Sequence, residues 1–141
     1  MTITKINPSN KIYISKSLIL KAGRGVFASK FIKKGEVVEQ CPAFVLPKKD
    51  YPIAKKTILR NYYFMWGKIT SAICFGYGSY YNHSYKPNAT YKKKIKEKVI
   101  EFIAIKDIKK DEEITVNYNY GKPDDKSSLW IKEIKSFNDG L

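Results

Sequence analysis

The residues best suited to chemistry lie in one short polar segment, Asn82–Asn88, whose sequence is NHSYKPN. This segment holds His83, the only histidine of the chain, and it follows an aromatic run that ends at Tyr81. Asn, Ser and Pro cluster here, which predicts a loop. A lone histidine is most often a structural residue, so His83 gains a functional interpretation only from its context.

Two other kinds of site can be considered for this segment. A metal site is not expected, because there is no second histidine and carboxylates do not cluster nearby. A Cys–His–Asn hydrolase would combine Cys41 or Cys74 with His83 and Asn88. Nothing in the sequence places either thiol beside a base or at a helix N-terminus, so the hydrolase stays an alternative.

Two further segments could contribute to a site. Asp111–Gly121 runs from an acidic turn into a predicted strand, and its tyrosines Tyr118 and Tyr120 are spaced i, i+2, so they point the same way. Earlier in the chain, the segment Gly23–Gly25 has the sequence GRG, and its two glycines permit positive φ and a close approach of the backbone to a ligand. Each segment alone also has an ordinary interpretation, as packed aromatics or as a hairpin turn.

A scaffold of short strands must position these segments. Alternation of apolar and polar residues, bounded by turn residues, predicts six strands. Those strands are expected at Lys11–Ser17, Val26–Phe31, Glu36–Gln40, Ile69–Phe75, Val99–Ile105 and Ile114–Tyr118. Helical spacing of apolar residues predicts two helices, at Asp50–Trp66 and Ser127–Phe137. The pattern contains many strands, little helix and no repeat.

Length and composition indicate one globular domain. The chain has 141 residues, of which 43% are hydrophobic, and this excludes a disordered chain. No apolar run approaches the ~18 residues of a membrane span, and the first ten residues lack the apolar region of a secretory signal. Two cysteines are too few for a disulfide scaffold. We therefore expect an intracellular protein that is neither secreted nor bound to a membrane.

The net charge is +14, from 27 basic and 13 acidic residues. Only Arg24 and Arg60 are arginine. The planar guanidinium of arginine forms paired hydrogen bonds with phosphates and base edges better than the ammonium of lysine does. This scarcity argues against a dedicated reader of DNA sequence. The charge still predicts non-specific attraction to nucleic acid or to another acidic surface.

Taken together, in this order and spacing, the three segments closely resemble the SET-domain protein lysine methyltransferases. Gly23–Gly25 matches the opening G-x-G of the family, and Asn82–Asn88 matches its R/N-H-S-x-x-P-N loop. Glu112–Tyr118 (EEITVNY) matches the closing E-E-[IL]-T-x-x-Y. The resemblance covers roughly Lys11–Gly121, and the compact chain looks most like the small stand-alone SET proteins of large DNA viruses.

The resemblance implies a mainly β fold, the SET-domain (β-clip) fold. In such folds short curved strands form small sheets, a C-terminal pseudoknot passes under a loop, and helices are few and short. A single domain would span residues 1–141, with a core at about 11–121 and a closing segment at 122–141. S-adenosylmethionine would bind in a surface groove, and the substrate lysine would enter a narrow channel from the other side.

The resemblance also implies roles for particular residues. Tyr118 would be the central catalytic tyrosine. The cofactor S-adenosylmethionine, which becomes S-adenosylhomocysteine, would be bound by Gly23, Arg24, Gly25, Tyr81, Asn82, His83, Tyr118 and Trp130. The lysine channel would be lined by Cys41, Tyr91 and Tyr120, and no metal is expected.

Two departures from the family pattern bear on how the channel closes. Tyr85 stands where a cysteine commonly follows N-H-S, and no Cys-x-Cys follows Tyr120 in this sequence. The zinc-binding post-SET module is therefore not expected. The predicted terminal helix with Trp130 is the natural substitute, and Trp130 would either stack on the adenine or pack in the core.

Two functions follow as hypotheses. The first is a protein-lysine N-methyltransferase, with a histone or nucleosome as a candidate substrate and a nuclear or host-nuclear location in that case. Methyl transfer to an amine needs alignment, exclusion of water and a neutral amine, which a ring of tyrosines and carbonyls can provide. The second is a catalytically silent SET-like module that binds chromatin or nucleic acid through its basic surface. Non-specific DNA contact is compatible with both, and a homodimer stays open.

Overall fold

The computed structural model describes residue 3 and residues 5–129 of the chain. This part is mainly β, as the sequence predicts, with nine strands, one short α-helix and two 3₁₀ helices. The strands are β1 (Ile12–Lys16), β2 (Arg24–Ala28), β3 (Val37–Val45), β4 (Phe64–Trp66), β5 (Thr70–Cys74), β6 (Asn82–His83), β7 (Ala89–Lys94), β8 (Val99–Ala104) and β9 (Glu113–Val116). The helices are α1 (Tyr51–Ala54), η1 (Ile58–Asn61) and η2 (Gly78–Tyr80).

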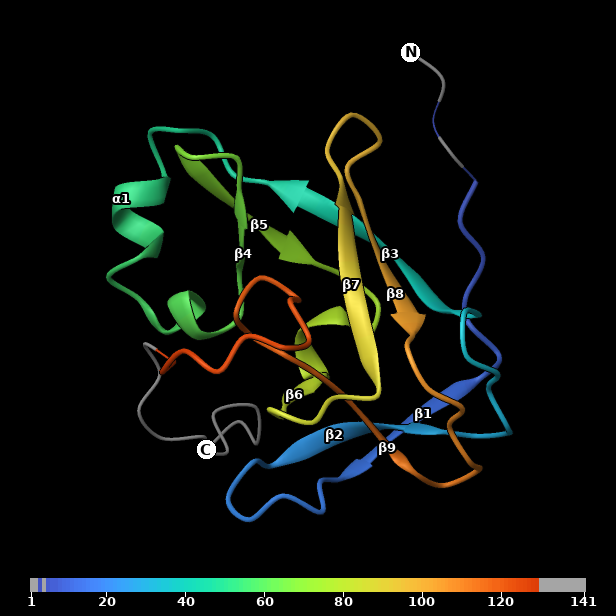
Figure 1. Cartoon of the computed structure of the whole chain (residues 1–141). Helices are drawn as coiled ribbons and strands as arrows, with labels where there is room; N and C mark the ends of the chain where they lie inside the picture. Colours follow the sequence, from blue (N-terminus) through green and yellow to red (C-terminus); the bar gives the residue numbers. More distant parts are fainter. Residues whose placement is uncertain (1–2, 4, 130–141) are drawn as a thin grey trace.

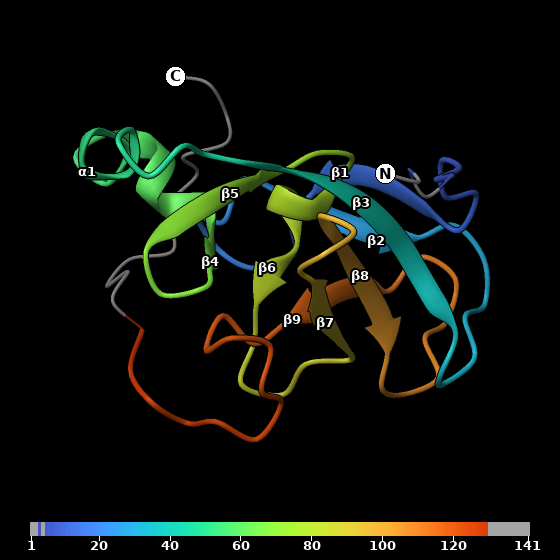
Figure 2. The same ribbon diagram turned by 90° about the horizontal axis from the view of Figure 1, so that it is seen from above.

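The strands form two sheets that lie at an angle to each other (Figures 1 and 2). The four-stranded sheet has the order β1-β2-β9-β6, and the five-stranded sheet has the order β4-β5-β3-β8-β7. In the smaller sheet, β9 pairs antiparallel with β2 through Val26 and Ile114, and parallel with β6 through Asn82 and Thr115. All three segments with candidate chemistry therefore meet in one sheet.

The core lies between the sheets and is built from alternate residues of their strands. Val26 and Ile114 are paired across β2 and β9, and both are fully buried. Ile100 and Phe102 of β8 belong to the same buried cluster. This close packing holds the strand ends at fixed positions, and the site residues lie at those ends.

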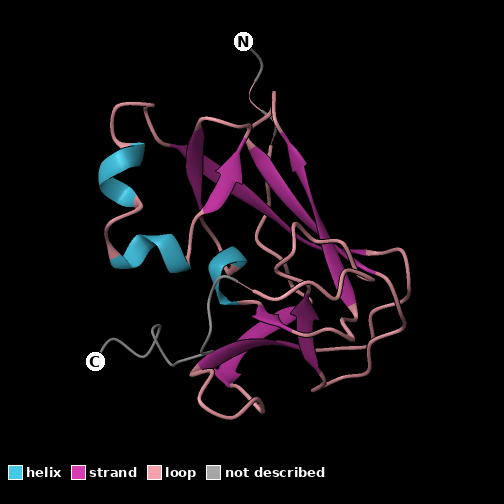
Figure 3. Ribbon diagram, turned by 60° about the vertical axis from the view of Figure 1, so that its left-hand side comes forward, coloured by secondary structure: helices cyan, strands magenta, loops and turns pink. Residues whose placement is uncertain are grey.

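The helices are few and short, and α1 and η1 lie together along one side of the molecule, beside β4 (Figure 3). The predicted helix Asp50–Trp66 is therefore wrong. Thr57 interrupts it, because its hydroxyl donates to the Ala54 carbonyl over 2.7 Å and accepts from the Leu59 N–H over 3.1 Å. Such side-chain bonds compete with a continuous helix.

The rest of that segment, Phe64–Trp66, pairs with β5 as strand β4. Strand β7 was not predicted, because the lysine run Lys92–Lys94 hides its alternation. The six predicted strands are present with their ends shifted by a few residues. The predicted helix Ser127–Phe137 lies mostly outside the described residues, and residues 127–129 have no regular secondary structure. No helix in the described part has the length and apolar character to cross a membrane.

Candidate functional site

The Gly23–Gly25 segment lies directly against Asn82. The second glycine, Gly25, is buried in β2, and a Cβ there would lie 2.5 Å from Oε2 of Glu113 and 3.1 Å from Nδ2 of Asn82. Glycine is required at this position because the side chains of Glu113 and Asn82 fill the space that a Cβ would take. Nδ2 of Asn82 also donates to the Arg24 carbonyl over 2.9 Å, so β2 and β6 are joined at the expected cofactor side.

The buried carboxylate of Glu113 organises this corner. It accepts hydrogen bonds from the Ser17 hydroxyl (2.8 Å), the Leu18 N–H (2.8 Å) and Nδ2 of Asn82 (3.1 Å). These donors come from the β1–β2 connection and from β6, so one side chain fixes two segments. Sequence reasoning did not assign Glu113 a role, although its place as the second glutamate of the E-E-I-T match was a usable signal.

Tyr118 is held at both ends by residues that flank Asn82. Its main-chain N–H donates to Nδ1 of His83 over 3.1 Å, and its hydroxyl donates to the Tyr81 carbonyl over 2.9 Å. Burial lowers the pKa of His83, which favours the neutral imidazole that can accept this bond. Nε2 of His83 is buried and has no hydrogen-bond partner among the described residues.

The loop that follows His83 is tied to β9 by Asn88. The side-chain amide donates to the Glu113 carbonyl and its oxygen accepts the Thr115 N–H, each over 2.9 Å. Asn88 therefore replaces the hydrogen bonds of a neighbouring strand. These bonds hold the Asn82–Asn88 segment against β9 and bring its first residues, Asn82 and His83, beside Tyr118.

A cavity of about 430 Å³ opens beside Tyr118. Tyr91 lines it, is 9% exposed, and packs edge-on against Phe64 at 5.1 Å between ring centres. Burial raises the pKa of both Tyr118 and Tyr91, so both phenols stay protonated at neutral pH. The aromatic residues around the cavity are Tyr62, Tyr63, Phe64, Tyr81, Tyr91, Tyr118 and Tyr120.

The rim of this cavity contains cations. Tyr120 lies at the rim, 64% exposed, and Nζ of Lys93 lies 5.4 Å from its ring centre. The same ammonium donates to the Met65 carbonyl over 2.6 Å, and burial lowers the pKa of Lys93. Lys55 and Arg60 also line the cavity, and none of its described lining residues is Asp, Glu or His.

A second, more open cavity of about 970 Å³ follows the β1–β2 connection. It is lined by residues 14–21 together with Gly23 and Arg24. Two of the three residues of the G-x-G segment therefore line a cavity.

Three expected site residues lie elsewhere or are not described. Cys41 is fully buried, does not line the tyrosine cavity, and faces Cys74, whose contact together with burial raises the pKa of the Cys41 thiol. We therefore correct its expected channel position: β3 turns this side chain into the core. A hydrolase based on either buried thiol has no support in this geometry. Trp130 lies outside the described residues.

The side chain of Tyr81 also differs from expectation. Its hydroxyl donates to Oε1 of Glu39 over 2.9 Å, and its ring stacks on Phe102 at 4.1 Å. The residue reaches the site through its carbonyl, which accepts from Tyr118, while its ring belongs to the core. Within the described residues, no three His, Cys, Asp or Glu side chains gather in an arrangement that could hold a metal ion.

Comparison with known proteins places the chain in a family. A SET domain model matches residues 23–119. The Schizosaccharomyces pombe histone-lysine N-methyltransferase specific for H3 lysine-37 is 30% identical over 117 residues, which cover 82% of this chain and 75% of that protein. A variant-silencing SET domain-containing protein of Plasmodium falciparum is 32% identical over 116 residues, which are only 4% of its length.

Solved structures agree. A crystal structure of a Plasmodium falciparum protein described as a histone methyltransferase has 34% identity and a TM-score of 0.64, and the match covers 82% of this chain and 96% of that one. The Chaetomium thermophilum Polycomb Repressive Complex 2 bound to S-adenosylmethionine shares the fold, with a TM-score of 0.68 at 24% identity over 82% of this chain and 16% of that one. The chain therefore belongs to the SET domain family and is homologous to histone-lysine methyltransferases.

Proposed function

We propose that this chain is an active methyltransferase that moves a methyl group from S-adenosylmethionine to a lysine side chain of a protein, and that the protein is a histone. The observation that carries the proposal is the double fixation of Tyr118, by His83 at its N–H and by Tyr81 at its hydroxyl, beside a cavity lined with tyrosines. The histone substrate is supported by the named specificity of the Schizosaccharomyces pombe relative.

The residues on the cofactor side fit S-adenosylmethionine. The side chains of Glu113 and Asn82 fill the space beside Gly25, so a larger residue there would displace Asn82, and Nε2 of His83 is a buried polar atom without a partner among the described residues. Such an atom is costly unless a ligand satisfies it. We assign Gly23, Arg24, Gly25, Asn82 and His83 to this ligand. When bound, it supplies an electrophilic methyl group.

The residues of the cavity orient and isolate the lysine amine. Tyr118 donates its proton to the Tyr81 carbonyl, so the oxygen of Tyr118 keeps its lone pairs for an N–H of the amine. Tyr91 provides a second neutral phenol, and the surrounding rings exclude water. Alignment and water exclusion of this kind can provide a large share of the reduction in activation free energy of a displacement reaction.

The lysine must reach this cavity without its proton. None of the described lining residues is a carboxylate or imidazole, so no lining group is placed to act as a general base. Cations at the rim, among them Lys93, disfavour a further positive charge inside. We therefore assign deprotonation to the solvent before the amine enters, and the protein selects the neutral form.

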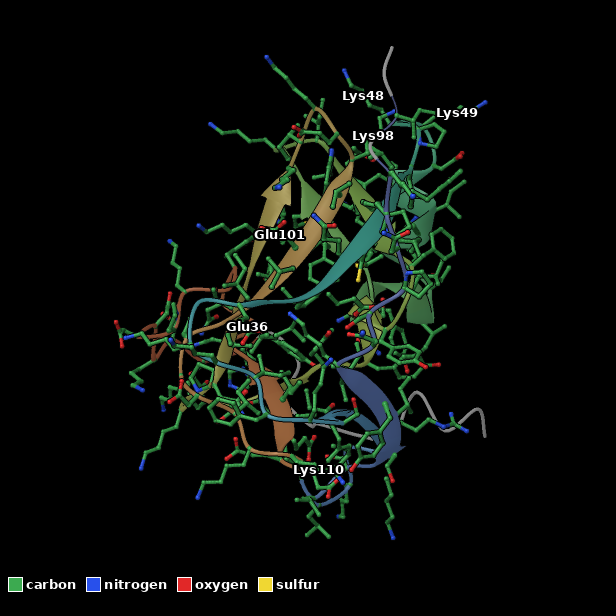
Figure 4. All side chains as sticks on the ribbon, turned by 90° about the vertical axis from the view of Figure 1, so that its right-hand side faces the viewer. Glu36, Lys48, Lys49, Lys98, Glu101 and Lys110 are labelled. Atoms are coloured by element: carbon green, nitrogen blue, oxygen red, sulfur yellow. The ribbon has the colours of Figure 1, made fainter. Side chains whose placement is uncertain are left out.

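The basic surface supports contact with nucleosomal DNA. Figure 4 shows Lys48, Lys49 and Lys98 towards one end of the molecule and Lys110 at the other, with Glu36 and Glu101 between them. The charge is thus spread over both ends, which suits non-specific attraction to phosphates. A histone substrate would place the protein in a nucleus. A homodimer stays a prediction.

The test is a pair of measurements on the full chain. Calorimetry with S-adenosylmethionine is expected to show binding, and a methylation assay is expected to label histones, with nucleosomes preferred over free histones. Absence of cofactor binding would contradict the enzyme and favour the silent chromatin-binding module. Cofactor binding without histone labelling, together with labelling of other proteins, would refute only the substrate.

A further inference from the structure

Tyr85 connects the active-site loop to the C-terminal strap, by which we mean residues 122–129. The hydroxyl of Tyr85 donates to the Ser127 carbonyl over 2.9 Å. In the opposite direction, Nζ of Lys126 donates to the Tyr85 carbonyl over 2.7 Å. Two neighbouring strap residues are therefore bound to one loop residue, from both its side chain and its main chain.

The strap has no strand partner and is fastened by side chains. Nδ2 of Asn119 donates to the Ser127 carbonyl over 2.8 Å, the acceptor that Tyr85 also uses. Nδ2 of Asn117 donates to the Asp125 carbonyl over 2.7 Å. Three side chains thus donate to strap carbonyls, and Lys126 of the strap donates to the loop, so the strap position depends on a small number of individual contacts rather than on a sheet.

The contact continues from Tyr85 to the centre of the site. The Tyr85 ring meets the His83 ring edge-on, at 4.4 Å between ring centres and an interplanar angle of 90°. His83 in turn accepts the N–H of Tyr118. One unbroken series of contacts thus runs from Ser127 through Tyr85 and His83 to Tyr118. Of these residues, Tyr85 is the one that touches both the strap and the imidazole.

We infer that Tyr85 is a positioning residue that clasps the strap onto the loop and so fixes the His83 imidazole on the cofactor side of the site. This inference rests on the proposed function for its effect on cofactor binding, although not for the clasp itself. Residues 122–129 contain no cysteine, so the strap is fastened to this loop by the hydrogen bonds described above. The strap ends at Leu129, directly before Trp130.

The inference predicts a specific kinetic pattern. A single hydrogen bond at a partly exposed site is worth a modest amount, so Tyr85→Phe is expected to raise the KM for S-adenosylmethionine about 3- to 10-fold. The rate at saturating cofactor should stay near that of the wild type, because the phenylalanine ring still packs on His83. Tyr85→Ala removes the ring contact with His83 as well, so it should raise the cofactor KM further and also lower the rate at saturating cofactor.

The chain offers a matched control. The hydroxyl of Tyr13 donates to Oδ1 of Asp111 over 2.9 Å, also at an exposed position and remote from the strap. Tyr13→Phe removes a tyrosine hydroxyl hydrogen bond of the same length, here to a carboxylate instead of a main-chain carbonyl. It should leave the cofactor KM unchanged, and both phenylalanine variants should melt within a few degrees of the wild type.

A second measurement tests the clasp without any cofactor. Trypsin can cut the strap between Lys126 and Ser127, next to the Ser127 carbonyl that accepts the Tyr85 hydroxyl. Tyr85→Phe removes this hydrogen bond and keeps the main-chain carbonyl that binds the Lys126 ammonium. Cleavage after Lys126 should be several times faster in Tyr85→Phe than in the wild type or in Tyr13→Phe. Equal cleavage in all three proteins would overturn the clasp. Faster cleavage with an unchanged cofactor KM would overturn the positioning role. If the wild type does not bind S-adenosylmethionine, the proposed function fails, and the cleavage rates still decide whether the clasp exists.

Discussion

The main-chain N–H of Tyr118 donates to Nδ1 of His83 over 3.1 Å, and this bond defines the protonation of the imidazole. Because Nδ1 accepts a hydrogen bond, it does not carry a proton itself. The one proton of the neutral imidazole ring therefore lies on Nε2. The single histidine of the chain therefore acts as a neutral linker between β6 and Tyr118, two residues after the end of β9. Its state depends on pH in a predictable direction.

Acidification should weaken the fold through His83. Burial lowers its pKa below the ordinary value of 6.5, so the unfolded chain binds this proton more tightly than the folded chain does. The contribution is complete above pH 6.5 and is lost as the pH falls towards the folded pKa. The pKa values of Glu36 and Glu101 are themselves lowered, so carboxylates titrate further down.

The measurement is the melting temperature of the wild type and of His83→Gln between pH 7 and pH 5. The wild type should lose stability across this interval, whereas the variant, which has no histidine, should change much less. Parallel curves for the two proteins would show that the imidazole does not take part.

Tyr118→Phe should abolish most turnover with little change in cofactor affinity. The variant keeps the ring and the main-chain bond to His83 but loses the oxygen that faces the amine. Loss of one preorganised polar group at a reacting centre costs about 100- to 1000-fold in rate. Single-turnover methylation and calorimetry would measure the two quantities. A variant that keeps more than half of the wild-type rate would show that another residue is central.

The rate should rise with pH between about 7 and 9, because a free lysine with a pKa near 10.4 is almost entirely protonated near neutrality. The raised pKa values of Tyr118 and Tyr91 keep these phenols protonated over the same interval, so they should not cause a compensating decline. Rates at subsaturating protein substrate provide the check. A flat profile would indicate a base that the cavity lining does not reveal.

Tyr91→Phe should change how many methyl groups are added. Tyr91 lines the cavity and is 9% exposed, and in the proposed channel its hydroxyl would limit the room that a methylated amine needs to turn. The hydroxyl can also hold a water molecule in the channel by hydrogen bonding. Tyr91→Phe keeps the ring, removes the hydroxyl and weakens the binding of that water, which leaves more room for the amine. Mass spectrometry should show a shift towards higher methylation at a similar first-step rate. An unchanged distribution of products would remove Tyr91 from the channel.

Lys93→Met should improve binding of the substrate lysine. The Lys93 ammonium lies over Tyr120 and binds the Met65 carbonyl, so a cation already occupies groups that would attract an incoming lysine. Methionine keeps the length and removes the charge, and a lower KM for the protein substrate, by about threefold or more, is expected. Lys92→Met is the control, because Lys92 is exposed on the other face of β7. If the KM for the protein substrate fell equally in both variants, the effect would come from the lower net charge and not from the position of Lys93.

Residue types at fixed spacings could be interpreted from the sequence, and they indicated which segments lie together in the fold. Gly25, Asn82, His83 and Tyr118 do come together in the fold, because short β strands have few ways to join such segments. Their catalytic roles stay predictions. The resemblance to the SET domain family and the mainly β class are confirmed by the family match and by the strands.

Other features depend on contacts that a sequence pattern does not contain. The register of β3 shifts between Val37 and Glu39, which buries Glu39 where simple alternation predicts an exposed side chain. Cys41 follows on the same strand and turns into the core for a related reason. The helix predicted at residues 50–66 failed because a side-chain hydrogen bond of Thr57 competes with helical periodicity. Pairing between distant segments decided each of these outcomes.

The central place of β9 has a consequence for how the molecule is made. This strand is synthesised late, yet its two partners, β2 and β6, belong to the first and middle parts of the chain. While the chain is still emerging from a ribosome, β2 has a bare edge and no second neighbour until residues 113–116 arrive. Pairing over such long sequence separations is slow, and open edges invite association with other chains. The proposed site is therefore complete only after β9 has been made, and a ligand bound there would join the early and late parts of the chain.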